Sequence, residues 1–272
     1  MFANWSSPSG GNITSGTLAQ MLATTGTAGQ SFYNTTYNAR FDWVVDRWIP
    51  TAPDPRYGFI QYDEFIGTDR IGQLDWLTTG TAPAIQLATS ALPGVFQIRA
   101  TAASGHSDIR SNSAGLQLGS MDLYLEASIS IPTLATVSED FSAAFGLNDG
   151  TAFDANSACT DGAYISINRA VNSAKWITNT SSGGSNTATN TTVTDIVAAT
   201  HYRLGILVSG SSTVTFYQNG VLMATHNTNL PVTASHQTGY CFRVDKVAGT
   251  AVSAINVDYL YSWGFFNGQR VA

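Results

Sequence analysis

Hydrophobic and polar residues alternate with a period of two along much of the chain, most clearly from His201 to His226. Within this stretch, Tyr202–Val208 alternates cleanly, residues 213–218 alternate again, and residues 221–226 form a return run. Asn219 and Gly220 separate the last two runs, and this pair is a strong hairpin signal because both turn residues must accept positive φ. The pattern predicts three antiparallel strands joined by two turns.

Two longer runs extend the pattern. The run 121–131 is expected to place alternate residues on one face: Leu123, Leu125, Ala127, Ile129 and Ile131. The run 254–266 is likewise expected to place on one face Ile255, Val257, Tyr259, Tyr261 and Trp263. Further strand candidates begin at Tyr62, contain Trp76, or cover residues 84–89, 95–101, 142–148, 163–169, 175–179 and 239–245. About a dozen short strands with turn signals between them, and almost no helical period, predict an all-β, two-sheet antiparallel sandwich. The segment 180–194 consists almost entirely of Ser, Thr, Asn and Gly, which predicts an exposed loop or a flat edge ribbon.

The first 58 residues differ from the rest of the chain. Residues 1–29 are rich in Ser, Thr, Gly and Ala, with two helical turns expected over residues 17–23, and an aromatic-rich segment leads to prolines at 50, 53 and 55. We therefore divide the chain into an N-terminal arm, 1–58, for attachment or oligomerisation, and a sandwich domain, 59–272. The arm has two interpretations: it packs on its own domain, or its aromatic residues dock on a neighbouring subunit or assembly.

Charge and cysteine content narrow the range of partners. Only 11% of the residues are charged, against about 25% in a typical globular chain, and the net charge is −6. No cluster of Lys and Arg is present, so neither nucleic acid nor an anionic membrane is expected as a partner. The N-terminus has no signal-peptide pattern, which predicts synthesis in a cytoplasm and favours a reduced, buried Cys159 and Cys241 over a disulfide.

Three segments resemble the concanavalin-like (laminin-G-like) jelly-roll family, especially its members in bacteriophage virion structural proteins. They are the opening YDEFIGTDRIGQLDW, the hairpin TVTFYQNGVLMATH with the following NTNLP, and the closing INVDYLYSWGFF. The resemblance covers about residues 59–272 and leaves the arm outside. It implies two curved antiparallel sheets, a concave face that often binds carbohydrate, and a location in the virion after synthesis in the host cytoplasm.

No catalytic constellation follows from the spacing of residues. Glycoside hydrolases of the resembled fold have Glu-x-Asp-x-x-Glu on a strand, and this chain lacks that motif. The pairs Asp63–Glu64 and Glu139–Asp140 are adjacent, so on a strand their side chains point to opposite faces. Each of the four histidines is isolated in sequence, and His201 and His226 are expected at strand ends. We therefore expect no enzymatic activity, no catalytic residue and no cofactor.

Two weaker binding candidates remain. Asp149, Asp154 and Asp161 lie in the loop that follows Asn148, and these four residues carry calcium-type ligands. Their spacing is not that of an EF-hand and a solvated polar loop is favoured, so no metal site is assigned. Trp176 precedes the Ser/Thr/Asn segment and is the best candidate for stacking on a sugar, although packing in the core is favoured for it.

These patterns lead to one main hypothesis and two alternatives. The main hypothesis is a non-enzymatic phage virion structural protein (a capsid decoration, head-fibre or tail-fibre component) that assembles with itself as a homotrimer and with other virion proteins such as capsid or tail, and that binds host-surface glycan. The first alternative is a carbohydrate-binding lectin or receptor-binding adhesin with Trp176 at its ligand face. The second, less favoured, is a glycan hydrolase or lyase with an unfamiliar site.

Overall fold

A computed structural model describes most of the chain. The described residues are 14–17, 20–21, 23–27, 30–35, 39–44, 47–51, 57–65, 74, 76–80, 83–87, 94–101, 104–111, 115–149, 159–193, 195–233 and 236–267. The chain forms two compact units: Met1–Ile60 with Gly268–Ala272, and Gln61–Asn267. Within the described residues, no helix is long and apolar enough to cross a membrane.

The first unit contains a four-stranded sheet that the sequence analysis did not predict. Its strands are β1 (Thr14–Gly16), β2 (Ser31–Asn34), β3 (Ala39–Val44) and β4 (Arg47–Pro50), in that order across the sheet, with β1 parallel to β2 and the other pairs antiparallel. Phe32 and Trp48 pack edge to face at a centroid distance of 5.7 Å, and the Trp48 indole donates a 3.1 Å hydrogen bond to the Thr24 carbonyl. Of the two expected helical turns at 17–23, the described part is a short helical segment at Gln20 and Met21.

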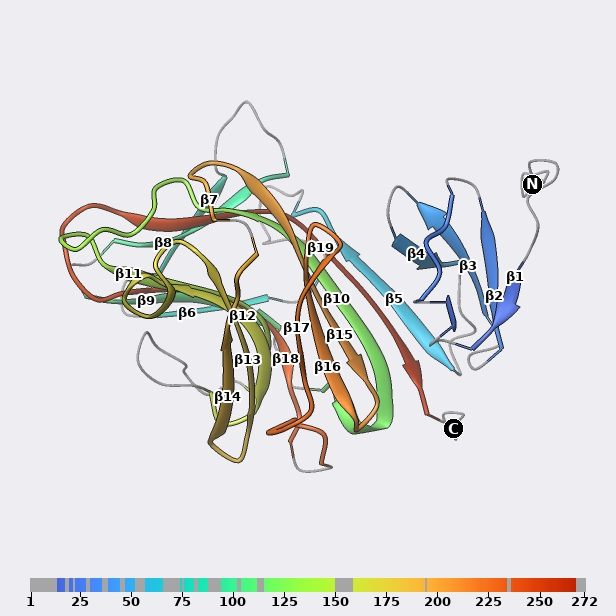
Figure 1. The fold of residues 1–272 in the computed structure, drawn as a ribbon. Coiled ribbons are helices and arrows are strands. Elements are labelled where there is room, and N and C mark those ends of the chain that lie inside the picture. Colours follow the sequence, from blue (N-terminus) through green and yellow to red (C-terminus); the bar gives the residue numbers. More distant parts are fainter. Residues whose placement is uncertain are drawn as a thin grey trace. The chain divides into compact units, whose positions relative to one another are not determined.

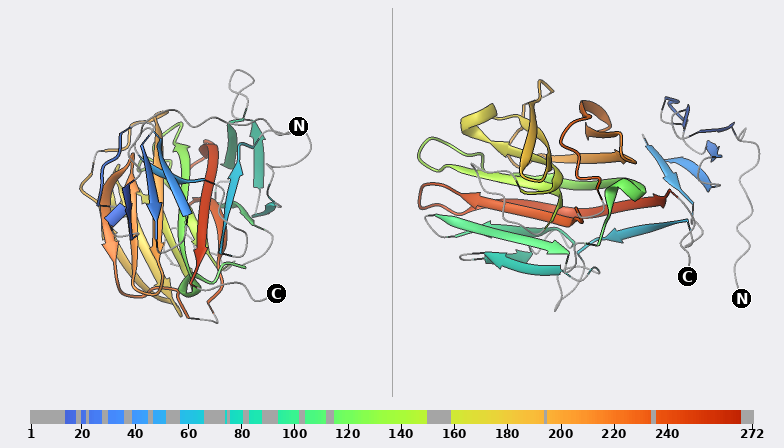
Figure 2. Two further views of the ribbon diagram at one scale, coloured as in Figure 1. Left: turned by 90° about the vertical axis from the view of Figure 1, so that its right-hand side faces the viewer. Right: turned by 90° about the horizontal axis from the view of Figure 1, so that it is seen from below.

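The second unit is a sandwich of two antiparallel sheets (Figure 1), which confirms the predicted fold class. The eight-stranded sheet has the order β17-β16-β15-β10-β19-β8-β7, with β5 also paired to β19. Its strands are β5 (Gly58–Asp63), β7 (Pro83–Leu87), β8 (Phe96–Ala100), β10 (Met121–Ser130), β15 (His201–Ser209), β16 (Thr213–Gln218), β17 (Val221–His226) and β19 (Ser253–Phe266). Figure 2 shows β5, β19 and β10 side by side in its right-hand view.

The seven-stranded sheet has the order β14-β13-β12-β11-β18-β9-β6. Its strands are β6 (Trp76–Gly80), β9 (Gly105–Ser111), β11 (Phe141–Asn148), β12 (Gly162–Asn168), β13 (Trp176–Ser182), β14 (Ser185–Asn190) and β18 (Gly239–Lys246). A 3-10 turn (Leu118–Ser120) precedes β10, and a short helix α2 (Arg169–Asn172) joins β12 to β13. Of the segment 180–194, predicted as a loop or edge ribbon, residues 180–182 end β13 and residues 185–190 form the edge strand β14.

The predicted central hairpin is confirmed in detail. Residues 201–226 form β15, β16 and β17, and Asn219 and Gly220 adopt φ of 51° and 80° at the turn. Asn219 also accepts a 2.9 Å hydrogen bond through Oδ1 from the Arg203 backbone N–H, which fixes the turn against β15.

The closing strand corrects one prediction. We expected Ile255, Val257, Tyr259, Tyr261 and Trp263 on one face, but the pairing of β19 with β10 shifts register between Ala127 and Ile129. This β-bulge adds a residue to β19 and reverses the alternation after it. Val257 therefore pairs with the core residue Ile129. Trp263 pairs with Tyr124 on the opposite face, and the two rings stack at a centroid distance of 5.8 Å.

Aromatic rings from both sheets form the centre of the core. Phe242 of β18 lies 5.0 Å from Phe145 of β11 and 6.3 Å from Phe96 of β8, and Phe65 lies 4.2 Å from Phe96. The buried Asp63 carboxylate links Leu74 to two rings of this cluster, those of Phe65 and Trp76. It accepts hydrogen bonds from the backbone N–H groups of Phe65 (2.8 Å) and Leu74 (2.9 Å) and from the Trp76 indole (2.9 Å).

Replacing Asp63 with Ala should lower the free energy of unfolding by several kcal/mol, because each buried N–H left without an acceptor costs about 1–3 kcal/mol. Urea denaturation followed by tryptophan fluorescence measures the loss. The matched control is Glu64→Ala, which removes a carboxylate next to it in sequence and should change stability by about 0.5 kcal/mol or less. Equal losses in the two variants would contradict the role given to Asp63.

Candidate functional site

The seven-stranded sheet has a polar face opposite the core. On β18, Phe242 and Val244 point inward, so Arg243 and Asp245 point to the other side, which we call the outer face. The strand register aligns Ala144, Arg243, Asp108 and Thr79 in one row across β11, β18, β9 and β6. The register of four neighbouring strands therefore places a charged pair, Arg243 and Asp108, in a row with Thr79 on the outer face.

Arg243 is the centre of this row. Its side chain is only 5% exposed, and its Nη1 lies 3.3 Å from Asp108 Oδ2 while its Nη2 lies 3.8 Å from Asp245 Oδ1. The Thr79 hydroxyl donates to Asp108, and His106 Nε2 lies 3.9 Å from the same carboxylate. A buried charge is tolerated when it is paired, so these contacts fix the guanidinium and both carboxylates in position.

Neutral hydrogen-bonding groups continue the outer face towards β13. The Asn179 amide donates to the Ser166 hydroxyl at 3.0 Å and to the Ile177 carbonyl at 3.3 Å. Ser166 is half-buried and pairs with Ala144 on β11 and with Ile177 on β13. On the outer face the Ser166 hydroxyl and the His106 imidazole are partly exposed, whereas the Asn179 amide and the Arg243 guanidinium are buried, and strands set the positions of all four groups.

The inner face of β13 is also polar, and it is paired with a histidine from the other sheet. His226 at the end of β17 is buried, and its Nδ1 lies 3.0 Å from the Thr180 hydroxyl. Its Nε2 lies 3.1 Å from the hydroxyls of Thr178 and Thr189. His226 therefore joins the edges of the two sheets by hydrogen bonds where apolar packing ends. Both His201 and His226 lie at strand ends, as predicted.

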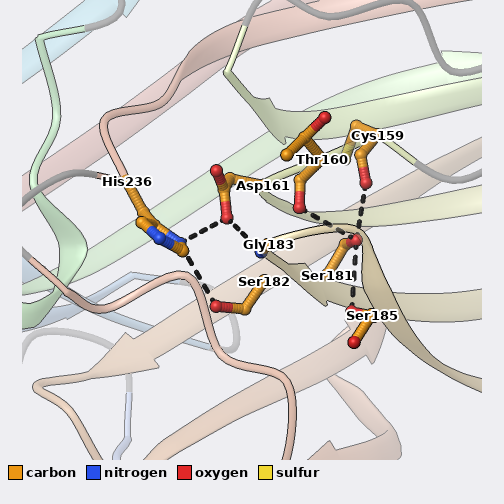
Figure 3. Close-up of polar contacts among 8 residues, drawn as sticks. All are labelled: Cys159, Thr160, Asp161, Ser181, Ser182, Gly183, Ser185 and His236. Atoms are coloured by element: carbon orange, nitrogen blue, oxygen red, sulfur yellow. Dashed lines mark hydrogen bonds and ion pairs between the residues drawn. The ribbon is translucent and has the colours of Figure 1, made fainter.

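His236, Asp161 and Ser182 come together although they are distant in sequence (Figure 3). The Asp161 carboxylate contacts Nδ1 of His236 and also accepts a 2.8 Å hydrogen bond from the Gly183 N–H. The Ser182 hydroxyl lies 3.2 Å from that same Nδ1. Sequence spacing gave no sign of this cluster, because the three residues belong to a loop before β12, to β13 and to the loop before β18.

The geometry of this cluster differs from that of a hydrolytic triad. A triad places the carboxylate on one imidazole nitrogen and the nucleophilic hydroxyl on the other, so that the ring can take the proton of the hydroxyl. Here both groups meet one nitrogen, and the neighbouring Ser181 hydroxyl is turned to the Cys159 carbonyl at 2.5 Å. The arrangement is that of a structural clamp between the β13–β14 turn and the two adjoining loops.

The two cysteines are free and buried, which confirms the preference for reduced thiols. Cys159 and Cys241 belong to one buried cluster with Ala144 and Tyr164, on the outer side of β11, β12 and β18. Burial raises the pKa of both thiols well above the usual range, so neither is a reactive thiolate.

Neither of the sequence-based binding candidates forms a site among the described residues. The Asp161 carboxylate contacts His236 and accepts a hydrogen bond from the Gly183 N–H. The Asp149 N–H donates to the Asp161 carbonyl at 3.0 Å, and Asp154 lies outside the described part of the chain. Over the described ranges, no group of three or more His, Cys, Asp or Glu is placed to hold a metal ion. Trp176 is 3% exposed and packs against Tyr202 of the other sheet at 6.1 Å, so its ring is not accessible for stacking on a sugar.

The fold defines the class of protein: an all-β jelly-roll sandwich of two antiparallel sheets. The family profile described as "SO2946-like, C-terminal domain" matches residues 91–258, and the chain belongs to this family. No curated protein matches the chain in sequence.

Solved structures share the fold at low sequence identity. The SO2946 protein of Shewanella oneidensis MR-1, described as of unknown function, aligns with a TM-score of 0.56 and 14% identity over 82% of this chain and 92% of its own. An endo-1,3-beta-glucanase from Streptomyces sioyaensis aligns with a TM-score of 0.54 and 13% identity over 79% and 98%. The carbohydrate recognition domain of Emp46p aligns with a TM-score of 0.50 and 8% identity over 69% and 88%. These similarities show a shared jelly-roll fold.

Burial lowers the pKa of His226, and this predicts a pH dependence of stability. The folded state binds this proton less readily than the unfolded state, so the free energy of unfolding should fall as the pH drops below about 6.5. His226→Gln, which keeps hydrogen-bonding groups but cannot titrate, should reduce that fall. Urea denaturation from pH 7.5 to pH 5 tests this, and an unchanged slope in the variant would contradict a buried, neutral His226.

Proposed function

We propose that the protein binds glycans on the outer face of the seven-stranded sheet and does not cleave them. The observation that carries the proposal is the partly exposed set Thr79, His106 and Ser166 on the outer face. Thr79 and His106 are held in position by their contacts with the buried Asp108, the partner of Arg243. Fixed donors and acceptors suit a ligand made of hydroxyl groups, because little conformational entropy is lost when they bind. The shared fold with a carbohydrate recognition domain and a glucanase supports the same ligand class.

Three features of the described residues favour binding over hydrolysis. Asp108 and Asp245 share one guanidinium, so both carboxylates are held as partners of a cation. Glu126, on the eight-stranded sheet, accepts hydrogen bonds from the hydroxyls of Tyr124 (2.7 Å) and Tyr259 (2.6 Å). The Ser182–His236–Asp161 cluster does not have the geometry of a triad. Retaining and inverting glycosidases need one carboxyl group that gives a proton and a second that attacks or activates water.

A glycan array on the intact chain should show selective binding, and Ser166→Trp should abolish it. The new ring would cover the outer face between β11 and β13, and we expect the affinity to fall by about tenfold or more, equivalent to about 1.4 kcal/mol. Thr215→Trp is the matched control, because Thr215 is also half-buried but lies on β16 of the other sheet. Thermal melting checks that both variants fold.

Equal binding by the wild-type chain and Ser166→Trp would contradict the placement on this face. Release of shorter products from a bound glycan on long incubation would contradict a non-enzymatic role.

A second, finer proposal concerns where the protein acts. The resemblance of the hairpin and closing strand to phage virion proteins, together with the low content of charged residues, favours a capsid decoration, head-fibre or tail-fibre component. In this role the N-terminal residues 1–58 would attach the sandwich to the particle or to its own copies, and the virion would be its location. Closed symmetric homo-oligomers are common among such assemblies, and we infer a homotrimer.

Light scattering of the intact chain and of a chain beginning at Phe59 tests this assembly. We expect a trimer for the intact chain and a monomer for the shorter one, because the first unit would supply the contacts between copies. A monomer in both cases would contradict self-assembly through the N-terminal unit. A trimer in both cases would place those contacts on the sandwich instead.

A further inference from the structure

The strand β14 forms one edge of the seven-stranded sheet, and its free side is unprotected (Figure 1). Among the described residues it pairs with β13 alone, in an antiparallel register without interruption. Proteins usually protect such an edge with charged side chains, proline or a β-bulge, because its free backbone groups can pair with another chain. β14 has none of these three features, whereas β17, an edge strand of the other sheet, has a bulge in its pairing.

Alternate residues of β14 direct their backbone groups to the free side. The two-residue turn 183–184 closes the β13–β14 hairpin with φ of 57° and 80°, so the residues that flank it form a hydrogen-bonded pair. Such pairs recur at every second residue, so Thr187 and Thr189 also bond to β13. The Thr191 N–H, at the next such position, donates to the Trp176 carbonyl at 3.1 Å, as this pattern requires. The residues whose N–H and C=O groups point away from β13 are therefore Asn186, Ala188 and Asn190.

Hydrogen bonds on the inner side hold β14 in place. The Thr187 hydroxyl lies 2.8 Å from the Thr228 hydroxyl and accepts a 2.9 Å hydrogen bond from the Asn229 amide. The Thr189 hydroxyl lies 3.1 Å from His226 Nε2. The residues that alternate with these two threonines are exposed. A strand that is already fixed loses little conformational entropy when a second strand pairs with it.

The sequence of β14 reads the same in both directions about its centre. Residues 186–190 are Asn-Thr-Ala-Thr-Asn, and the residues before and after them, Ser185 and Thr191, both carry a hydroxyl. An antiparallel pair related by a two-fold axis at Ala188 would thus place Asn opposite Asn and Thr opposite Thr. Thr–Thr pairs stabilise neighbouring strands, and β14 has no charged residue that would repel its copy. The edge is therefore complementary to itself.

We propose that β14 pairs with β14 of a second copy of this chain about that two-fold axis. The free backbone groups of residues 186, 188 and 190 then all find partners, because hydrogen-bonded pairs recur at every second residue. The two seven-stranded sheets become one continuous sheet, with both outer faces on the same side. This contact needs only the second unit, so it is additional to the self-assembly proposed for residues 1–58 and does not depend on glycan binding.

The contact is expected to be weak in dilute solution. It involves one short strand from each copy, which is less than the roughly 1,600 Å² of a standard interface. It would therefore form at high protein concentration, or between copies that are held close together on a larger assembly, where the effective concentration is high.

Disulfide trapping of the intact chain tests the proposal. Two residues in a hydrogen-bonded antiparallel pair have Cα atoms about 5.5 Å apart, a distance that a disulfide can span. Ala188→Cys at high protein concentration should therefore give a disulfide-linked dimer with glutathione disulfide, which is reduced to two glutathione thiols as the two introduced thiols join. Non-reducing electrophoresis detects the dimer. The native Cys159 and Cys241 are buried, so they should not react.

Asn186→Cys is the matched control, because this residue is exposed on the same strand but does not face its own copy. The axis at Ala188 places the two copies of residue 186 about 14 Å apart, too far for a disulfide. Asn186→Cys alone should stay unlinked, and so should Asn190→Cys alone. A mixture of the two variants should be linked, because residue 186 faces residue 190 of the second copy. Thermal melting checks that each variant folds.

Charges at the axis provide a second measurement that needs no thiol. Ala188→Lys and Ala188→Glu each place two like charges opposite one another, which should weaken association by about tenfold or more. Sedimentation at increasing protein concentration should show larger species for the wild-type chain and for a mixture of the two variants, but not for either variant alone.

Three results would overturn the proposal. Absence of linked Ala188→Cys chains at every concentration would show that β14 does not meet its copy. Equal linking of Ala188→Cys and Asn186→Cys would indicate random collision without the two-fold register. Association that neither charge weakens would place the contact on another surface.

Discussion

The burial of Arg243 is the constraint on which the outer face depends. Every residue of β18 is buried, so the alternation that places Phe242 in the aromatic core also places a guanidinium on the other side with little access to water. An unpaired charge there would cost several kcal/mol, and removing one partner of a buried pair typically costs about 3–5 kcal/mol. Asp108 and Asp245 provide the compensation, and with Thr79 and His106 they form a rigid polar row. The same strand thus fixes the core and the candidate binding surface.

Polar contacts also replace apolar ones at the edge of the sandwich where β13 faces β17. On β13, Trp176 packs on Tyr202 as an ordinary core residue, but Thr178 and Thr180 place hydroxyls on the inner face. His226 satisfies these hydroxyls from the opposite sheet, and the His236–Asp161 contact holds the end of the β13–β14 turn. A strand rich in Ser, Thr and Asn can therefore belong to the sandwich although it contributes few apolar side chains.

The sequence predicted features that depend on local periodicity. The hairpin at Asn219 and Gly220 follows from its turn residues, and the inward face of β10 follows from alternation. Both signals come from residues that are adjacent in the sequence. The sequence analysis did not predict the β-bulge in β19, because one inserted residue in a run of alternating aromatic residues does not change the composition. The sites were less predictable still. Arg243 and Asp108 are 135 positions apart, and His236 and Ser182 are 54 apart, so each pair depends on the order of strands in the sheets. Trp176 was the best sugar-stacking candidate in the sequence, although core packing was favoured for it, and its position on the inner face of β13 explains why it is buried.

The most direct test of this account is the mapping of a bound glycan onto the sandwich by backbone amide chemical shifts. The glycan would be the strongest binder from the array, added to the intact, isotope-labelled protein. The account predicts that the largest shifts fall on β9, β11, β12 and β18, around Asp108, Ser166 and Arg243. Shifts confined to the eight-stranded sheet or to the first unit would contradict it.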